Sequence, residues 1–262
     1  MTKSPGLHLG IALCVLVLAL LVVDNSRLRA AGPVHPLSVK GKPVPALRVA
    51  GYPGLITKAV YPRVSGAGLN LKVVNERLQS AVVAEEKRFG RFLRSYEPHV
   101  SKIDRQRLHG GFETSLKPSL LSASTVVVSA LMPDTECVPG CTGGDFWLSV
   151  TVRVPSGDVV ALPRLFANPS SGLRRLASFA ERRVRASNRC IGPYFDPTGF
   201  APTWKNYESF ALTTSGIVVG FGTSQVGLPG CGRVSTIVPY HVIAPFFSDL
   251  GRQLVAGVRP AS

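Results

Sequence analysis

One long helical pattern between strand-like segments most constrains how this chain can fold. In residues 69–96, apolar side chains recur near helical spacing on one face, and Pro98 follows the end of that pattern. The residues of this expected apolar face are Leu71, Val74, Leu78, Val82, Phe89 and Leu93. Strand-like runs precede it at 56–66 and follow it at 111–117, 120–131 and 145–154. Because helices and strands do not alternate in a βαβ rhythm, we predict an α+β fold. It would have a mixed, mainly antiparallel sheet and two to three packed helices.

The C-terminal part shows the same mixture around a second amphipathic helix, expected at residues 171–186. Leu173, Leu176, Phe179, Ala180 and Val184 give it an apolar face, and five arginines line the other side. We expect strands in 209–216, 217–226 and 233–243, and a final helix at 244–255.

The N-terminus predicts export. Residues 7–23 form an apolar run that follows Lys3 and ends before Asp24, as in an export signal, with cleavage after Ala30 as an option. The run is long for a signal peptide and slightly short for a membrane span. Residues 1–32 are therefore expected to be a signal peptide or a signal anchor, with 7–23 holding the chain in the membrane if uncleaved. Residues 33–55, rich in proline and glycine, are expected to be an extended linker.

Four cysteines lie beyond the apolar run: Cys137, Cys141, Cys190 and Cys231. An even number in an exported chain favours two disulfides, and we expect Cys137–Cys141 across the CVPGC turn together with Cys190–Cys231. The alternative is a metal site. However, no histidine lies near CVPGC and the spacing is not that of paired zinc knuckles, so we expect no metal and no cofactor.

The net charge of +15 predicts attraction to anions such as lipid headgroups, acidic wall polymers or acidic proteins. Residues 1–30 hold three of the basic residues and one acidic residue, so the chain without them keeps +13. Nucleic acid is not expected, because no recognition motif is present. The alternative is that the charge serves solubility alone.

A candidate binding surface combines the arginines of the second helix with aromatic residues that follow it. Trp204 and Tyr207 suit a sugar-binding surface, although they suit a cover for the core equally well. The candidate residues are Arg174, Arg175, Arg182, Arg183, Trp204, Tyr207 and Tyr240.

The glycine-rich stretch 217–232 raises the question of a nucleotide-binding loop. Gly222 and Gly227 have the spacing of a P-loop, but Leu228 and Pro229 follow instead of lysine and a hydroxyl residue. A strand is expected next rather than a helix. The stretch therefore predicts a strand, a turn and a strand, with glycines for bends and close backbone approach.

Known catalytic patterns are missing from the sequence. There is no Gly-x-Ser-x-Gly and no His-Glu-x-x-His, and His241 beside Tyr240 is the best placed histidine. Glu85 and Glu86, beside Lys87 and Arg88, are expected on a solvated helix face. The other acidic residues do not single out a pair facing one cleft: Asp134, Glu136, Asp145, Asp196 and Glu208.

Two stretches carry a resemblance to a known family. FALTTSGIVVGFGTSQVGLPGCGRVSTIVPYHVI resembles the C-terminal pattern of the RsiV-like extracytoplasmic domain family, with Val238-Pro239-Tyr240 before the last helix. DFWLSVTVRVPSGDVVALPRLF resembles the strand, turn and entry segment of that domain. The resemblance covers residues 61–254 and extends to secreted mycobacterial-type antigens. It implies an N-terminal α+β module at 56–155 and a C-terminal RsiV-like module at 156–262, together forming one compact unit.

The resemblance implies a non-enzymatic extracellular role. We expect an exported cell-envelope or secreted binding protein that recognises an extracytoplasmic protein or an anionic envelope polymer. Lysozyme is a candidate partner through the family, although its basic charge opposes long-range attraction to a chain of +13. The alternatives are an envelope hydrolase or esterase acting on cell-wall material, and a secreted effector that binds host proteins.

Overall fold

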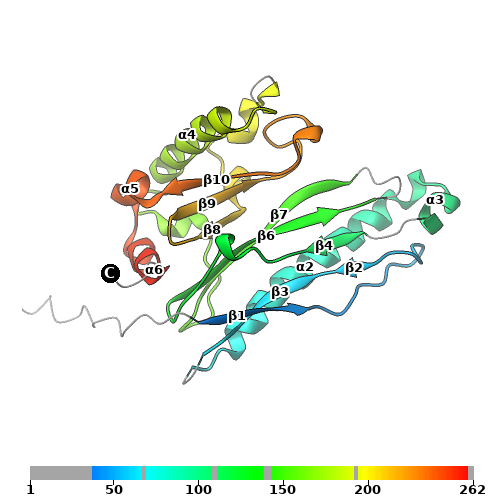
Figure 1. The fold of residues 1–262 in the computed structure, drawn as a ribbon, viewed down its shortest axis with the longest axis horizontal. Coiled ribbons are helices and arrows are strands. Elements are labelled where there is room, and N and C mark those ends of the chain that lie inside the picture. Colours follow the sequence, from blue (N-terminus) through cyan, green and yellow to red (C-terminus); the bar gives the residue numbers. More distant parts are fainter. Residues whose placement is uncertain (1–36, 67–68, 108–110, 139–142, 192–193, 259–262) are drawn as a thin grey trace, which may run out of the picture. The chain divides into compact units, whose positions relative to one another are not determined.

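A five-stranded sheet and a three-stranded sheet lie between two long helices in the computed structural model (Figure 1), and a two-stranded sheet lies beside the larger one. The structure describes residues 37–66, 69–107, 111–138, 143–191 and 194–258. Helix α2 (Lys72–Tyr96) packs on the first sheet, and α4 (Pro169–Ser187) packs on the second. The mixed α+β fold with antiparallel sheets is therefore confirmed.

The first sheet is organised around its longest strand, β6 (Val127–Glu136). On one edge β6 pairs antiparallel with β4 (Phe112–Thr114) and β5 (Leu121–Ala123), and on the other edge with β7 (Gly144–Arg153). The short β2 (Thr57–Lys58) pairs parallel with β4. Most positions of β6 are buried, as its apolar residues dictate.

A two-stranded antiparallel sheet, β1 (Ser38–Pro43) with β3 (Val60–Ser65), lies beside these strands. Its strand β3 packs against α2 and also contacts β4. The Thr114 hydroxyl connects β3 to β4, because it accepts from the Val60 N–H and donates to the Val60 C=O. Residues 33–55 were expected to be an extended linker, and for the described part, 37–55, this prediction is wrong. Val44, Val49 and Tyr52 are buried, so residues 37–55 contribute to the core.

Helix α2 confirms the helical pattern of the sequence. The residues expected on its apolar face are all buried: Leu71, Val74, Leu78, Val82, Phe89 and Leu93. They meet Val128, Ala130 and Met132 of β6 in one core. The side chain of Asn70 accepts from the Lys72 N–H at the start of the helix.

The second sheet is antiparallel, in the order β10 (Val234–Pro239), β9 (Gly216–Phe221), β8 (Phe210–Leu212). Helix α4 starts at Asn168, whose side chain accepts from the Ser171 N–H, with Pro169 in the first turn. The strand expected at 233–243 ends at Pro239, after which α5 (Tyr240–Ile243) begins. Helix α6 (Asp249–Val258) starts later than expected, since a separate turn occupies Ala244–Phe246.

The described residues contain five α-helices, where two to three were expected. The difference comes mainly from short helices, α3 (Lys102–Arg107) and α5. No helix in the described ranges is long and apolar enough to cross a membrane. The expected signal or anchor helix at 7–23 lies outside the described residues.

The two sheets meet face to face, with Leu131 of β6 against Ala211 and Val218 of the second sheet. The expected modules 56–155 and 156–262 are also linked by backbone pairing, since Val152 forms a bridge with Val159. The described residues from Leu37 onward belong to one compact unit.

The disulfide between Cys190 and Cys231 gives a stability prediction. The Cα atoms are 5.6 Å apart, and the bond closes a sequence separation of 41 residues around β8 and β9. Cys190→Ser should lower the free energy of unfolding by about 2–5 kcal/mol, because the unfolded chain gains freedom. Thermal unfolding with and without reductant measures this. Reductant should lower the wild-type melting temperature toward that of the variant, and equal melting temperatures without reductant would contradict the prediction.

Candidate functional site

A groove of about 700 Å³ lies along β7. Its walls come from α2, from the segment after β7 and from the segment before β8. The lining is mostly apolar, with a few charged and hydroxyl groups. The lining residues are Arg77, Ser80, Ala81, Ser149, Val150, Thr151, Val159, Val160, Ala161, Leu162, Pro163, Trp204, Lys205, Glu208 and Phe210.

The outer edge of β7 supplies backbone groups beside this groove. The Thr151 C=O accepts from the Val160 N–H on the side away from β6. Alternate residues of a strand direct their backbone groups to the same side, so those of Ser149 also point away from β6. No described residue pairs with the N–H or C=O of Ser149 on that side. The groove therefore borders an open strand edge.

Side chains fix the wall opposite β7. Trp204 is partly buried and stacks on Phe166, with ring centroids 6.4 Å apart. The Ser149 hydroxyl donates to the Glu208 C=O at 2.9 Å. Val159, on the other side, is 54% exposed. The groove thus offers solvent-exposed apolar surface next to unpaired backbone groups.

The structure separates the residues of the predicted binding surface. Arg174, Arg175, Arg182 and Arg183 are exposed on α4, whereas Trp204 lies in the groove. Tyr207 and Tyr240 were wrong as surface residues, because both are buried in the C-terminal core. The Tyr207 hydroxyl donates to the Phe200 C=O, and the Tyr240 hydroxyl donates to the Thr213 C=O. Burial raises the pKa of Tyr207.

The expected Cys190–Cys231 disulfide is present in the structure. The expected Cys137–Cys141 bond involves residue 141, which lies outside the described residues.

The glycine-rich stretch 217–232 leads from β9 to β10, so the predicted order of strand, turn and strand is confirmed. The first strand ends at Phe221 rather than at 226, and a loop with a 3-10 turn at Pro229–Cys231 follows it. Gly220 shows why glycine is needed there, since an added Cβ would lie 2.6 Å from the Trp147 indole. Packing between the sheets therefore accounts for this glycine.

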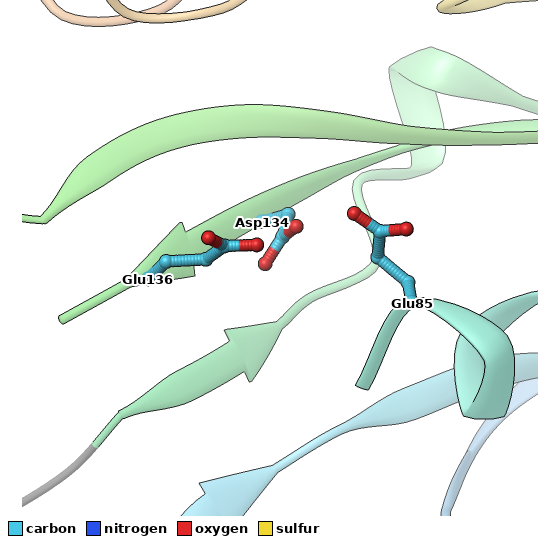
Figure 2. Close-up of side chains that lie close together, drawn as sticks. All are labelled: Glu85, Asp134 and Glu136. Carbon is cyan, nitrogen blue, oxygen red and sulfur yellow. The ribbon is translucent and has the colours of Figure 1, made fainter. Parts of the chain in front are cut away.

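A second group of functional side chains lies where α2 meets the end of β6. Figure 2 shows the carboxylates of Glu85, Asp134 and Glu136 close together, the first from α2 and the other two from β6. One carboxylate oxygen from each lies within 4.8 Å of the others. Asp134 and Glu136 share a face of the strand because they are two residues apart.

Sequence reasoning missed this acidic cluster of Glu85, Asp134 and Glu136. The expectation of a solvated face was wrong for Glu86, which is 3% exposed and accepts from the Leu47 N–H. Glu85 faces β6 and is partly buried. The available signal was the alternation of β6, which places Asp134 and Glu136 in line with the core residues Ala130 and Met132.

The three carboxylates differ in their partners. Arg88 of α2 forms ion pairs with both Glu85 and Glu136. Asp134 is 1% exposed, and no described residue donates a hydrogen bond to either of its carboxylate oxygens. Its backbone C=O accepts from Arg233, which also contacts the Asp145 carboxylate. The Asp134 backbone is therefore held in place, whereas its carboxylate has no hydrogen-bond donor among the described residues.

Electrostatics follow from these contacts. Burial raises the pKa of Asp134 to about 8, with the negative charges of Glu136 and Glu85 adding to the effect and Arg88 and Arg233 opposing it. Burial also raises the pKa of Glu136, against the opposing attraction of Arg88. In this cluster the negative charge of the Asp134 carboxylate is therefore not balanced by a directly paired positive group among the described residues.

Comparison with known proteins bears on the fold alone. No model of a known protein family matches the chain, and no curated protein does. A crystal structure of a member of the DUF3298 family from Bacteroides fragilis is similar, with a TM-score of 0.53 and 14% identity, over 83% of this chain and 96% of that one. A DUF3298 family protein from Pseudomonas aeruginosa has a TM-score of 0.48 and 10% identity, over 88% of this chain and 97% of that one.

Asp134 gives a pH prediction. Its pKa rises from 3.8 to about 8 on folding, so the folded state keeps this proton to higher pH than the unfolded state. Raising the pH through this window should lower the free energy of unfolding, by at most about 1.4 kcal/mol per pH unit from this group. In Asp134→Asn the free energy of unfolding should not fall in this way as the pH rises, because asparagine has no proton to lose.

Urea unfolding at about pH 5 and about pH 8, with a chelator present, measures the difference between wild type and Asp134→Asn. Glu113→Gln, at an exposed position of β4, is the matched control and should keep the wild-type slope. Parallel pH profiles for wild type and Asp134→Asn would contradict the prediction.

Proposed function

We propose that this chain is an exported, non-enzymatic binding protein of the cell envelope that captures an extended segment of a partner protein. The groove along β7 is the proposed binding site. The observation that carries the proposal is the open edge of β7 at Ser149, which lies beside exposed apolar side chains.

An open strand edge suits an extended polypeptide. Its unpaired N–H and C=O groups are those that a further strand would pair with, and neighbouring apolar pockets would select side chains of that strand. Val159, Ala161 and Trp204 supply such apolar contacts in the groove. This mode of binding requires no reacting group.

Export is supported by two features. The apolar run 7–23 follows a basic residue, as in export signals. The Cys190–Cys231 disulfide fits a protein that folds in an oxidising compartment. The resemblance to the RsiV-like extracytoplasmic domain family supports the same role, whereas the similar crystal structures bear on the fold alone.

The groove carries charges of both signs. Arg77 and Lys205 are basic, while Glu208 is acidic and exposed, so the lining is net positive like the whole chain. Glu208 offers one local contact for a basic side chain of a partner, against the long-range repulsion expected from a chain that carries +13 without residues 1–30. Lysozyme, to which the family resemblance points, is accordingly the first protein to test.

The binding test uses a substitution that fills the groove along β7 with a large side chain. Ala161 is exposed and lines it, so Ala161→Trp should block access and weaken lysozyme binding by about tenfold or more, as expected for a central contact. Ala186→Trp, on an exposed position of α4, is the matched control and should bind as wild type. Calorimetric titration of the full chain in mild detergent at physiological salt measures both.

A different result would move the site to α4. Failure to bind lysozyme, together with salt-sensitive binding to a teichoic acid that Arg174→Glu/Arg183→Glu abolishes, would reject the groove. It would instead favour recognition of an anionic polymer by the exposed arginines.

A further inference from the structure

We propose that Glu85, Asp134 and Glu136 form a binding site for a divalent cation of the hard, oxygen-preferring class, Ca²⁺, Mg²⁺ or Mn²⁺. This site is separate from the groove along β7, since none of the three residues lines it. The proposal therefore does not depend on the proposed partner.

The geometry of the acidic cluster suits one ion. One oxygen from each carboxylate lies within 4.8 Å of the other two. Two oxygens bound to the same cation at 2.0–2.6 Å each lie at most about 5 Å apart. The three side chains come from only two elements, α2 and β6, and Figure 2 shows them gathered around one place. Regular secondary structure thus holds the ligands in position.

Asp134 supplies the observation that points to a ligand. A carboxylate that is 99% buried normally accepts several hydrogen bonds, because leaving it unpaired is costly. Asp134 is 1% exposed, and no described residue donates to either oxygen. Its side chain lies among Glu85 and Glu136, where a bound cation would provide the partner.

Charge counting favours a divalent ion. The three carboxylates together carry three negative charges when ionised, and Arg88, which pairs with Glu85 and Glu136, balances one of them. Arg233 is directed to the backbone C=O of Asp134 and to Asp145, so it does not pair with the Asp134 carboxylate. Two negative charges remain for the cation to neutralise.

An ion can reach the acidic cluster from solvent. Glu136 and Arg88 line a pocket of about 390 Å³, together with Phe92, Phe146 and Thr223. The Arg88 side chain is 44% exposed, so solvent reaches this side of the acidic cluster. Because all three metal ligands would be carboxylate oxygens, the site favours Ca²⁺, Mg²⁺ or Mn²⁺ over softer metals.

The test uses the full chain, freed of metal with a chelator and then desalted. Titration with Ca²⁺, Mg²⁺ and Mn²⁺ by calorimetry, with electron paramagnetic resonance for Mn²⁺, should show saturable binding of one ion per chain. Asp134→Asn keeps the side-chain shape and should weaken affinity by about tenfold or more. Glu113→Gln, an exposed carboxylate on β4, is the matched control and should bind as wild type.

A second variant separates ligand loss from misfolding. Arg88→Gln removes the positive charge that competes with the ion, so it should tighten binding, whereas a folding defect would weaken it. Circular dichroism confirms that each variant is folded. The proposal would be overturned by the lack of saturable binding of all three ions to wild type, or by wild-type affinity in Asp134→Asn. Neither result bears on lysozyme binding, so the two proposals fail separately.

Discussion

The whole fold depends on β6 belonging to two cores at once. Alternate residues of this strand face opposite sides, so Val128, Ala130 and Met132 meet α2, while Val127 and Leu131 meet the C-terminal elements. A single strand can serve both sides only where both of its faces are apolar, as in residues 127–132, where Ser129 alone is polar. Strands β4, β5 and β7 each pair with β6, and β8 of the second sheet contacts it.

Both candidate sites arise where this arrangement ends. At the C-terminal end of β6 the face toward α2 changes from apolar residues to Asp134 and Glu136, which places carboxylates in a buried setting. At the far edge of the sheet, β7 pairs with β6 on one side, and on the other side the backbone N–H and C=O of Ser149 have no partner among the described residues. The acidic cluster therefore arises because carboxylates are buried without enough positive charge beside them. The groove arises because the sheet ends at β7 while apolar side chains extend beyond that edge.

Periodicity in the sequence was sufficient for elements whose burial follows from local pattern. The buried face of α2 and the strand expected at 145–154 were predicted correctly, because each depends on spacing within one segment. The strand expected at 217–226 is present as β9 but ends at Phe221. Tyr207 and Tyr240 were wrongly predicted at the surface, because a tyrosine hydroxyl is usually solvated. Here each hydroxyl donates to a buried backbone C=O instead, which the sequence does not reveal. Glu85 could not be joined to Asp134 because the contact between α2 and β6 is a tertiary one. Four cysteines allow three connectivities, and the expected Cys190–Cys231 pairing is confirmed.

Hydroxyl groups at the interface between the sheets have an effect that apolar packing alone would lack. Ser129 accepts from the Leu212 N–H, and Ser122 donates to the Leu212 C=O, so two serines of the first sheet satisfy the backbone of one residue in β8. Flat apolar faces can slide past each other at little cost, whereas a displaced sheet would leave these buried groups without partners. These hydrogen bonds therefore select a single lateral alignment of the two sheets. They make this alignment specific without adding a large amount of stability, because the net contribution of each hydrogen bond is modest.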